Sequence, residues 1–172
     1  MHRGAISVIA GASGAAVLTL AHEVGRHLID DAPRMDVLGK RALVALRRQA
    51  GAGEIDASSL HQQTLAGDLV ANSFYYSLVG SGSRQGVVAR GLALGVLAGV
   101  GALVLPRPMG LGDPPSVESP RNRLLTVGYY TLGGLVAAAT ALALQARAAT
   151  AGDGQSFHRR VRPRQAWRGA VR

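Results

Sequence analysis

Long apolar stretches alternate with polar ones along this chain, and three of them are long enough to cross a membrane. Residues 86–105 and 124–146 are apolar and rich in glycine and alanine, and residues 5–21 form a third apolar run. An α-helix rises about 1.5 Å per residue, so about 20 apolar residues cross a hydrocarbon core roughly 30 Å thick. The pattern predicts an all-α, helical integral membrane bundle with three transmembrane helices.

The first apolar run also has some features of a signal peptide. Met1-His2-Arg3 precede it, and Thr19-Leu20-Ala21 forms a weak cleavage site. The run is long for a signal peptide, and the cleavage site departs from the usual pattern of small residues. We therefore expect an uncleaved first helix from about Gly4 to Ile29, with polar last turns.

Residues 36–49 form an amphipathic pattern at helical spacing. Apolar and basic side chains occupy opposite sides: Leu38, Ala42, Ala45 and Leu46 against Lys40, Arg41, Arg47 and Arg48. Such a helix can lie in an anionic headgroup layer, or it can pack its apolar side on the bundle and leave the basic side in water. Both interpretations place it beside the membrane.

Residues 60–79 have the length of a span but carry several polar side chains. Ser59 and Gln62 fit a capping box, which predicts a helix that begins at Leu60. Asp68 lies near the middle of this segment, and on insertion scales a carboxylate at the bilayer centre costs about 3 kcal/mol. The segment is therefore a borderline fourth helix.

The distribution of basic residues bears on whether this segment crosses. With three spans and the N-terminus outside, fifteen basic residues lie on the cytoplasmic side and four on the other. With four spans the split is ten against nine, which gives no orientation. The charge rule favours three spans with a cytoplasmic C-terminus, whereas the short break at residues 80–83 favours a fourth helix that folds back at membrane depth.

Breaks and composition divide the rest of the chain. Five prolines mark a stiff loop between residues 106 and 120, and the last span ends near Ala146. Residues 147–172 are rich in Gly, Gln and Arg, which predicts a basic disordered tail with residues 158–164 as its core. The predicted organisation is one membrane domain, residues 1–146, followed by this tail.

Composition and charge restrict the possible partners. Hydrophobic residues make up 48% of the chain, aromatic residues only 4%, and there is no cysteine. The formal charge is +9, but eighteen of the nineteen basic residues are arginine, as expected from a GC-rich genome, and no series of aromatic residues for base stacking accompanies them. We expect the lipid bilayer of a bacterial-type plasma membrane as the main partner, and no nucleic acid.

Polar residues at helical spacing form the best candidate site. His61, Thr64, Asp68, Asn72 and Tyr75 recur every three or four residues and so share one helix face. In the first helix, Thr19, Glu23 and His27 do the same. If the two faces meet, a cluster of carboxylates and histidines lies inside the bundle, where ionisable groups often mark ion or proton paths. The alternative is a face that meets water or headgroups.

Small residues at four-residue spacing predict close helix packing. The positions are Gly11 and Ala15, then Gly91, Gly95 and Gly99, then Gly133, Ala137 and Ala141. Helices inside lipid associate through such faces because their backbones can approach closely. The faces can hold one chain together or join several copies.

Three short motifs suggest chemistry but lack the residues it needs. His22-Glu23-Val24-Gly25-Arg26-His27 has one residue more than HExxH, which turns its two histidines about 140° apart. Gly11-Ala12-Ser13-Gly14 lacks the third glycine of a dinucleotide-binding turn. The same four residues resemble the GxSG motif of rhomboid proteases, in which the serine is the nucleophile. That resemblance implies a histidine base on another span, and residues 86–105 and 124–146 contain none.

The sequence therefore predicts no cofactor, no metal and no catalytic residue. We expect a non-enzymatic scaffold or partner subunit of a membrane complex, with a homo-oligomer or another membrane protein as partner. A small transporter or channel component built around Asp68 and Glu23 is the second reading. An intramembrane hydrolase is the third.

Overall fold

The computed structural model describes residues 2–30, 32–114 and 119–161, with side chains as far as Thr150. The described residues form five α-helices and one short 3₁₀ turn. In chain order these are α1 (Arg3–Leu28), α2 (Met35–Gln49), α3 (Ala57–Gly80), η1 (Arg84–Gly86), α4 (Val87–Val104) and α5 (Pro120–Val161). Within these residues there is no strand, so the predicted all-helical class is confirmed.

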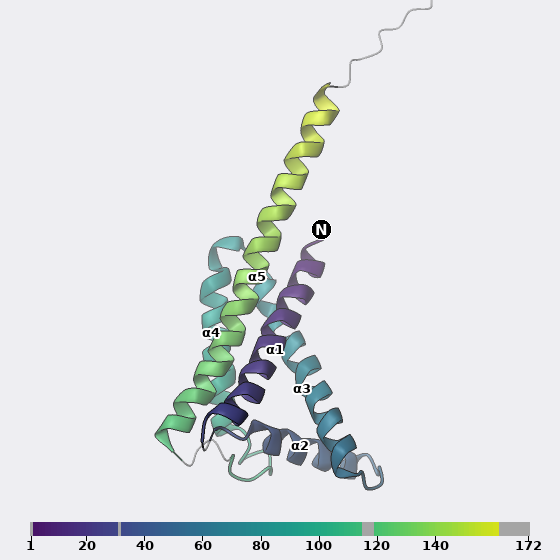
Figure 1. The fold of residues 1–172 in the computed structure, drawn as a ribbon. Coiled ribbons are helices and arrows are strands. Elements are labelled where there is room, and N and C mark those ends of the chain that lie inside the picture. The colour runs from purple at the N-terminus through teal and green to yellow at the C-terminus, as the bar shows by residue number, and fades with distance from the viewer. Residues whose placement is uncertain (1, 31, 115–118, 162–172) are drawn as a thin grey trace, which may run out of the picture.

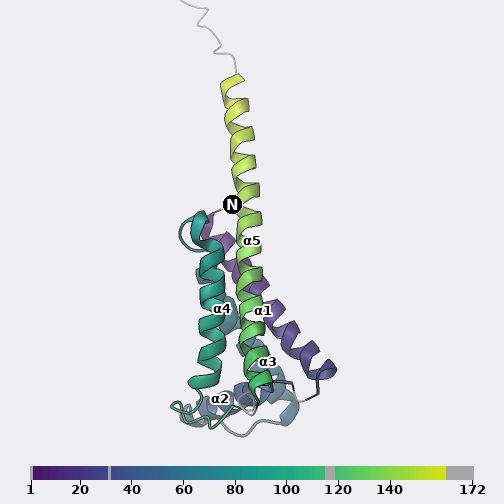
Figure 2. The same ribbon diagram turned by 90° about the vertical axis from the view of Figure 1, so that its left-hand side faces the viewer.

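Four of the helices lie side by side as a bundle, and α2 crosses one end of it (Figure 1). α1 packs on α3 and α5, α5 packs on α4, and α3 also contacts both α4 and α5. α1 and α4 run in one direction, and α3 and α5 run in the other (Figure 1). As a result, the start of α1 and the α3–α4 turn lie at one end, and α2 lies at the other end with the loop before α5 (Figures 1 and 2).

Three helices are long and apolar enough to cross a membrane: Arg3–Leu28, the helical segment Arg84–Val104, and Pro120–Thr150 within α5. These segments correspond to the three predicted spans, residues 5–21, 86–105 and 124–146. α3 is less apolar, but it packs alongside α1, α4 and α5. The Tyr75 hydroxyl donates to the Leu94 carbonyl of α4 at 2.9 Å, and the Tyr76 hydroxyl donates to the Tyr130 carbonyl of α5 at 2.7 Å.

Two predicted helix ends differ from the structure. α3 begins at Ala57, because the Asp56 carboxylate accepts hydrogen bonds from the backbone N–H groups of Ser58 and Ser59 at 3.0 and 2.9 Å. The predicted capping box at Ser59 is therefore wrong, and Asp56 caps the helix. α5 runs on to Val161, past the predicted end at Ala146, and extends beyond the other helices (Figure 2). The part of the predicted tail from residue 162 onward lies outside the described residues.

The α3–α4 turn is held by a glycine and an arginine. Gly82 has φ of +84°, a left-handed conformation that favours glycine. Arg90 of α4 reaches back to donate to the carbonyls of Val79 at 3.2 Å and Ser83 at 2.8 Å. These contacts fix α3 against α4 at this end of the bundle.

Glycines set how closely the helices approach. A Cβ added to Gly14 of α1 would lie 2.6 Å from the Gly133 carbonyl oxygen of α5, and one added to Gly91 of α4 would lie 2.5 Å from that of Gly134. One added to Gly11 would lie 2.7 Å from the Ser77 nitrogen of α3. The backbones therefore touch where no side chain intervenes. The remaining predicted small positions lie in the same contacts: Ala15 and Ala137 are fully buried, Gly95 and Gly99 face α5, and Gly133 faces α1 and α3.

The close approach does not extend along the whole of α1. Near its C-terminus, Gly25 meets the Tyr129 hydroxyl of α5 rather than backbone. The His22 ring packs edge-on against Tyr129 and Tyr130, with ring centroids 5.2 and 5.6 Å apart. α1 consequently diverges from its neighbours toward the end of the bundle that α2 covers (Figure 1). This divergence leaves room between the helices.

Two glycines of α5 allow a matched test of this packing. Gly134→Ala places a methyl group against the α4 backbone and should destabilise the bundle by about 1–3 kcal/mol. The methyl group of Gly128→Ala would point into open space. This substitution should leave the stability of the bundle unchanged or raise it by up to about 1 kcal/mol, because alanine has the higher helix propensity. The measurement is the unfolding free energy of each purified variant in mixed micelles with increasing SDS. Equal values for the two variants would contradict the close approach of α4 and α5.

Candidate functional site

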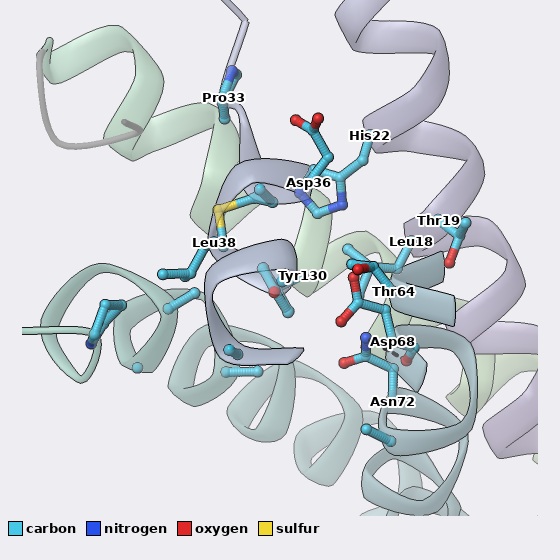
Figure 3. Close-up of a pocket in the computed structure, with 18 of the residues that line it drawn as sticks. Leu18, Thr19, His22, Pro33, Asp36, Leu38, Thr64, Asp68, Asn72 and Tyr130 are labelled. Carbon is cyan, nitrogen blue, oxygen red and sulfur yellow. Dashed lines mark hydrogen bonds between the residues drawn. The ribbon is translucent and has the colours of Figure 1, made fainter. Parts of the chain in front are cut away.

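A cavity of about 650 Å³ lies where the helices diverge, beneath α2. Its wall comes from the C-terminal halves of α1 and α4, the N-terminal half of α3, Tyr130 of α5, α2, and the loop that follows α4. Figure 3 shows side chains of these elements around it. The volume is within the range of pockets that bind small molecules.

Most of the wall is apolar. Leu18 of α1, Leu65 of α3, Leu97 of α4, and Leu105 and Met109 of the segment that follows α4 contribute to it. The rings of Tyr75 and Tyr130 add aromatic surface. A ligand with an apolar part would therefore find extensive apolar surface here.

The polar groups of the wall are concentrated on the facing sides of α1 and α3. α3 contributes His61, Thr64, Asp68 and Asn72, and α1 contributes Thr19, His22, Glu23 and Arg26. Figure 3 shows His22, Asp68, Asn72 and Tyr130 around the same space. The two polar faces identified in the sequence thus meet, although not every predicted member takes part.

The structure brings five of the six predicted polar residues to the cavity: Glu23, His61, Asp68, Asn72 and Tyr75. The sixth, His27, is exposed and does not line it. Sequence reasoning missed His22, Tyr130 and Asp36. His22 is one residue away from the Thr19–Glu23 face, and Tyr130 sits in an apolar span, so neither position has a signal in helical spacing alone.

Several polar groups of the cavity are already satisfied within the chain. The Glu23 carboxylate forms an ion pair with the Arg26 guanidinium at 2.5 Å. The Thr64 hydroxyl donates to the Leu60 carbonyl, and the Asn72 amide donates to the Asp68 backbone carbonyl. The side-chain carboxylate of Asp68 differs from them. It has no hydrogen bond or ion pair to any residue that the structure describes. The Nε2 atom of His22 is also buried without a partner in this part of the chain.

α2 closes the cavity at Gly39. A Cβ added there would lie 2.6 Å from the Thr64 Cγ2 atom and 3.1 Å from the Asp68 Oδ2 atom, so α2 rests directly on α3. Arg41 joins α2 to the loop after α4 by donating to the carbonyls of Leu111 and Asp113, at 3.2 and 2.9 Å. Both contacts hold α2 across the end of the bundle.

The start of α2 is held by an ion-paired carboxylate. Asp36 accepts from Arg34 at 3.0 Å and from Lys40 at 3.2 Å. Burial acts to raise the pKa of Asp36, but these two hydrogen bonds and the charges of their donors outweigh it, so its pKa lies below the usual value. The negative charge also sits in the first turn of α2, where it interacts favourably with the helix dipole.

Ser13, the serine of the GxSG-like motif, makes its hydrogen bond within its own helix. Its hydroxyl donates to the Ile9 carbonyl at 2.9 Å. No three histidine, cysteine, aspartate or glutamate side chains in the described ranges are grouped closely enough to hold a metal ion. Comparison with protein families, with curated proteins and with solved structures gives no match to this chain.

The ion pairs of Asp36 should make the stability of the protein depend on pH. Because the pKa of Asp36 is lowered in the folded state, its contribution is fully present above pH about 4 and is lost as the pH falls through the lowered pKa. Asp36→Asn should lower the melting temperature at pH 7. It should also reduce the stability that the protein loses between about pH 5 and pH 3, a window that brackets the usual aspartate pKa of about 4. Circular dichroism melts in detergent measure both.

Asp113→Asn is the control for this prediction. Asp113 also pairs with an arginine, Arg107, but both side chains are largely exposed, and such pairs contribute little to stability. If both substitutions change the melting curves equally, Asp36 has no special role in holding α2.

Proposed function

We propose that this chain is a small multi-pass integral membrane protein with four crossing helices, and that it binds a small molecule in the cavity beneath α2 as a component of a transporter. The observation that carries the proposal is the Asp68 carboxylate, which lines a cavity between the helices without an ion-pair partner among the described residues. Ionisable groups placed in this way at membrane depth are costly and are usually retained for transport or binding.

The depth of Asp68 supports this role. Tyr75 is hydrogen-bonded to Leu94, which lies near the middle of α4. Asp68 is seven positions before Tyr75, about 10 Å along the helix toward α2. A hydrocarbon core roughly 30 Å thick extends about 15 Å from its middle, so the carboxylate would sit inside the membrane but near its α2 side.

The shape of the bundle favours a binding site over an open channel. The cavity occupies the α2 end, and the opposite end is closed by the backbone contacts of Gly11, Gly14 and Gly91. A transporter needs a site that opens to one side at a time, and such sites commonly lie between helices near mid-membrane. An open channel would need a continuous passage through these glycine contacts.

A scaffold or partner-subunit role is the second candidate. It is supported by α5, which continues to Val161 beyond the other helices and leaves a long helical segment uncovered (Figures 1 and 2). We place it second because a scaffold has no need for a cavity with an unpaired carboxylate.

The absence of native cysteine gives a direct test of the four crossings. Gly4→Cys and Thr150→Cys should react with a membrane-impermeant maleimide from one face of the membrane, and Gly51→Cys and Gly110→Cys from the other. Four crossings put both ends of the described bundle on the same side, whereas three crossings put them on opposite sides. Labelling of intact and opened vesicles decides between these outcomes, and reaction of Gly4→Cys and Thr150→Cys from opposite faces would refute the fourth crossing.

A second test asks whether the cavity is open to water in the membrane. Ala98 lines the cavity, whereas Val100 lies nearly opposite on α4 and is exposed on the outside of the bundle. In proteoliposomes, the thiol of Ala98→Cys should react with the neutral reagent 2-hydroxyethyl methanethiosulfonate, because a hydrated thiol can ionise and attack. Val100→Cys should stay unreactive in lipid. Equal, negligible rates for both variants would contradict a solvent-accessible cavity and with it the proposed binding role.

A further inference from the structure

We propose that the cavity beneath α2 selects a hydrophobic cation, that is, an amine or quaternary ammonium attached to an apolar group, and that Asp68 provides the charge that holds it. This inference rests on the proposed function, because it assigns a ligand class to the same site. Three features of the cavity wall support it: the charges of its side chains, the hydrogen-bond donors that already donate within the chain, and its aromatic and apolar surface.

The charges of the cavity wall favour a cation. Three carboxylates line the cavity, but two of them have cationic partners: Glu23 pairs with Arg26, and Asp36 pairs with Arg34 and Lys40. Only the charge of Asp68 is left without a partner in the described part of the chain. A cationic ligand would supply the missing partner, and inside a cavity of low polarity such a pair is stronger than in water.

Several hydrogen-bond donors of the wall are already used, which weakens the site for an anion. The hydroxyls of Thr64 and Tyr75 donate to the carbonyls of Leu60 and Leu94, and the amide of Asn72 donates to the carbonyl of Asp68. Among the described residues that line the cavity, the buried nitrogens without a partner are Arg26 Nε and His22 Nε2. The charge of Arg26 is already offset by Glu23, so these two nitrogens give an anion little net attraction.

The rest of the wall offers aromatic and apolar surface. Tyr75 and Tyr130 both contribute to it, and aromatic faces attract cations such as quaternary ammonium groups. Leu18, Leu97 and Leu105 offer apolar surface for the rest of a ligand. A strongly hydrated inorganic cation would gain nothing from this surface, whereas an organic cation would gain from both parts.

The test uses protection of the Ala98→Cys thiol in proteoliposomes against 2-hydroxyethyl methanethiosulfonate. Three probes share a benzene ring but differ in charge: benzyltrimethylammonium, benzyl alcohol and benzenesulfonate. Benzyltrimethylammonium should slow the modification at the lowest concentration. Replacing Asp68 by Asn in the same protein should raise the half-protecting concentration of this cation about tenfold, which corresponds to about 1.4 kcal/mol.

Two controls separate charge from structure. Asp68→Asn keeps the size of the side chain and the backbone carbonyl that Asn72 contacts, so the rate of modification without a probe should not change. Glu54→Gln removes an exposed carboxylate outside the cavity and should leave protection by the cation unchanged. A loss of protection in the Glu54 variant would mean that surface charge, and not Asp68, attracts the cation.

The possible outcomes are distinct. Equal protection by the cation and the alcohol, independent of Asp68, would overturn the charge selectivity but leave the binding role in place. Best protection by benzenesulfonate would also overturn it and would point to Arg26. An accessible thiol that none of the three probes protects would contradict the proposed binding function itself.

Discussion

The contact of helix backbones at glycine is the constraint on which the rest of this structure depends. At Gly14, Gly91 and Gly134, an added Cβ would collide with the backbone of the neighbouring helix. In the proposed membrane location no hydrophobic force pulls helices together, so such close contacts would supply the attraction. They hold α1 and α4 against α5, and the separation is left to the C-terminal part of α1, where Gly25 meets the Tyr129 side chain.

The separation at the other end follows from larger side chains. His22, Tyr129 and Tyr130 pack edge-on between α1 and α5 where glycine no longer meets backbone. The helices diverge there, and α2 covers the opening by resting on Thr64 and Asp68 through Gly39. The cavity is therefore a consequence of side-chain size along two helices, and α2 needs a glycine to close it.

Much of the fold could be predicted from the sequence because length and hydropathy determine which segments can be membrane helices. The three apolar runs correspond to α1, α4 and α5, and the amphipathic pattern lies within α2. The start of α3 was misassigned because Ser59 and Asp56 are both good capping residues, and only the fold decides which of them turns toward the free N–H groups. Hydropathy also ended the last helix at Ala146, whereas a helix can continue through polar residues outside a membrane.

The candidate site could be predicted in part, since helical spacing finds residues that share a face. It identified Asp68, Asn72 and Tyr75 on α3, and Glu23 on α1. It could not find His22 or Tyr130, because their place in the site depends on how α1 and α5 are rotated against each other. It included His27, which continues the Glu23 face but is exposed and does not line the cavity.

The division between a glycine-packed end and a side-chain-lined end has an evolutionary consequence. Positions such as Gly14 and Gly134 tolerate no larger residue without moving a helix, whereas Leu97, Ala98 or Leu105 can change in size and polarity with little effect on how the helices meet. Selection could therefore alter what the cavity accepts while the bundle stays the same. Descendants of one ancestral chain could recognise different compounds on an unchanged scaffold.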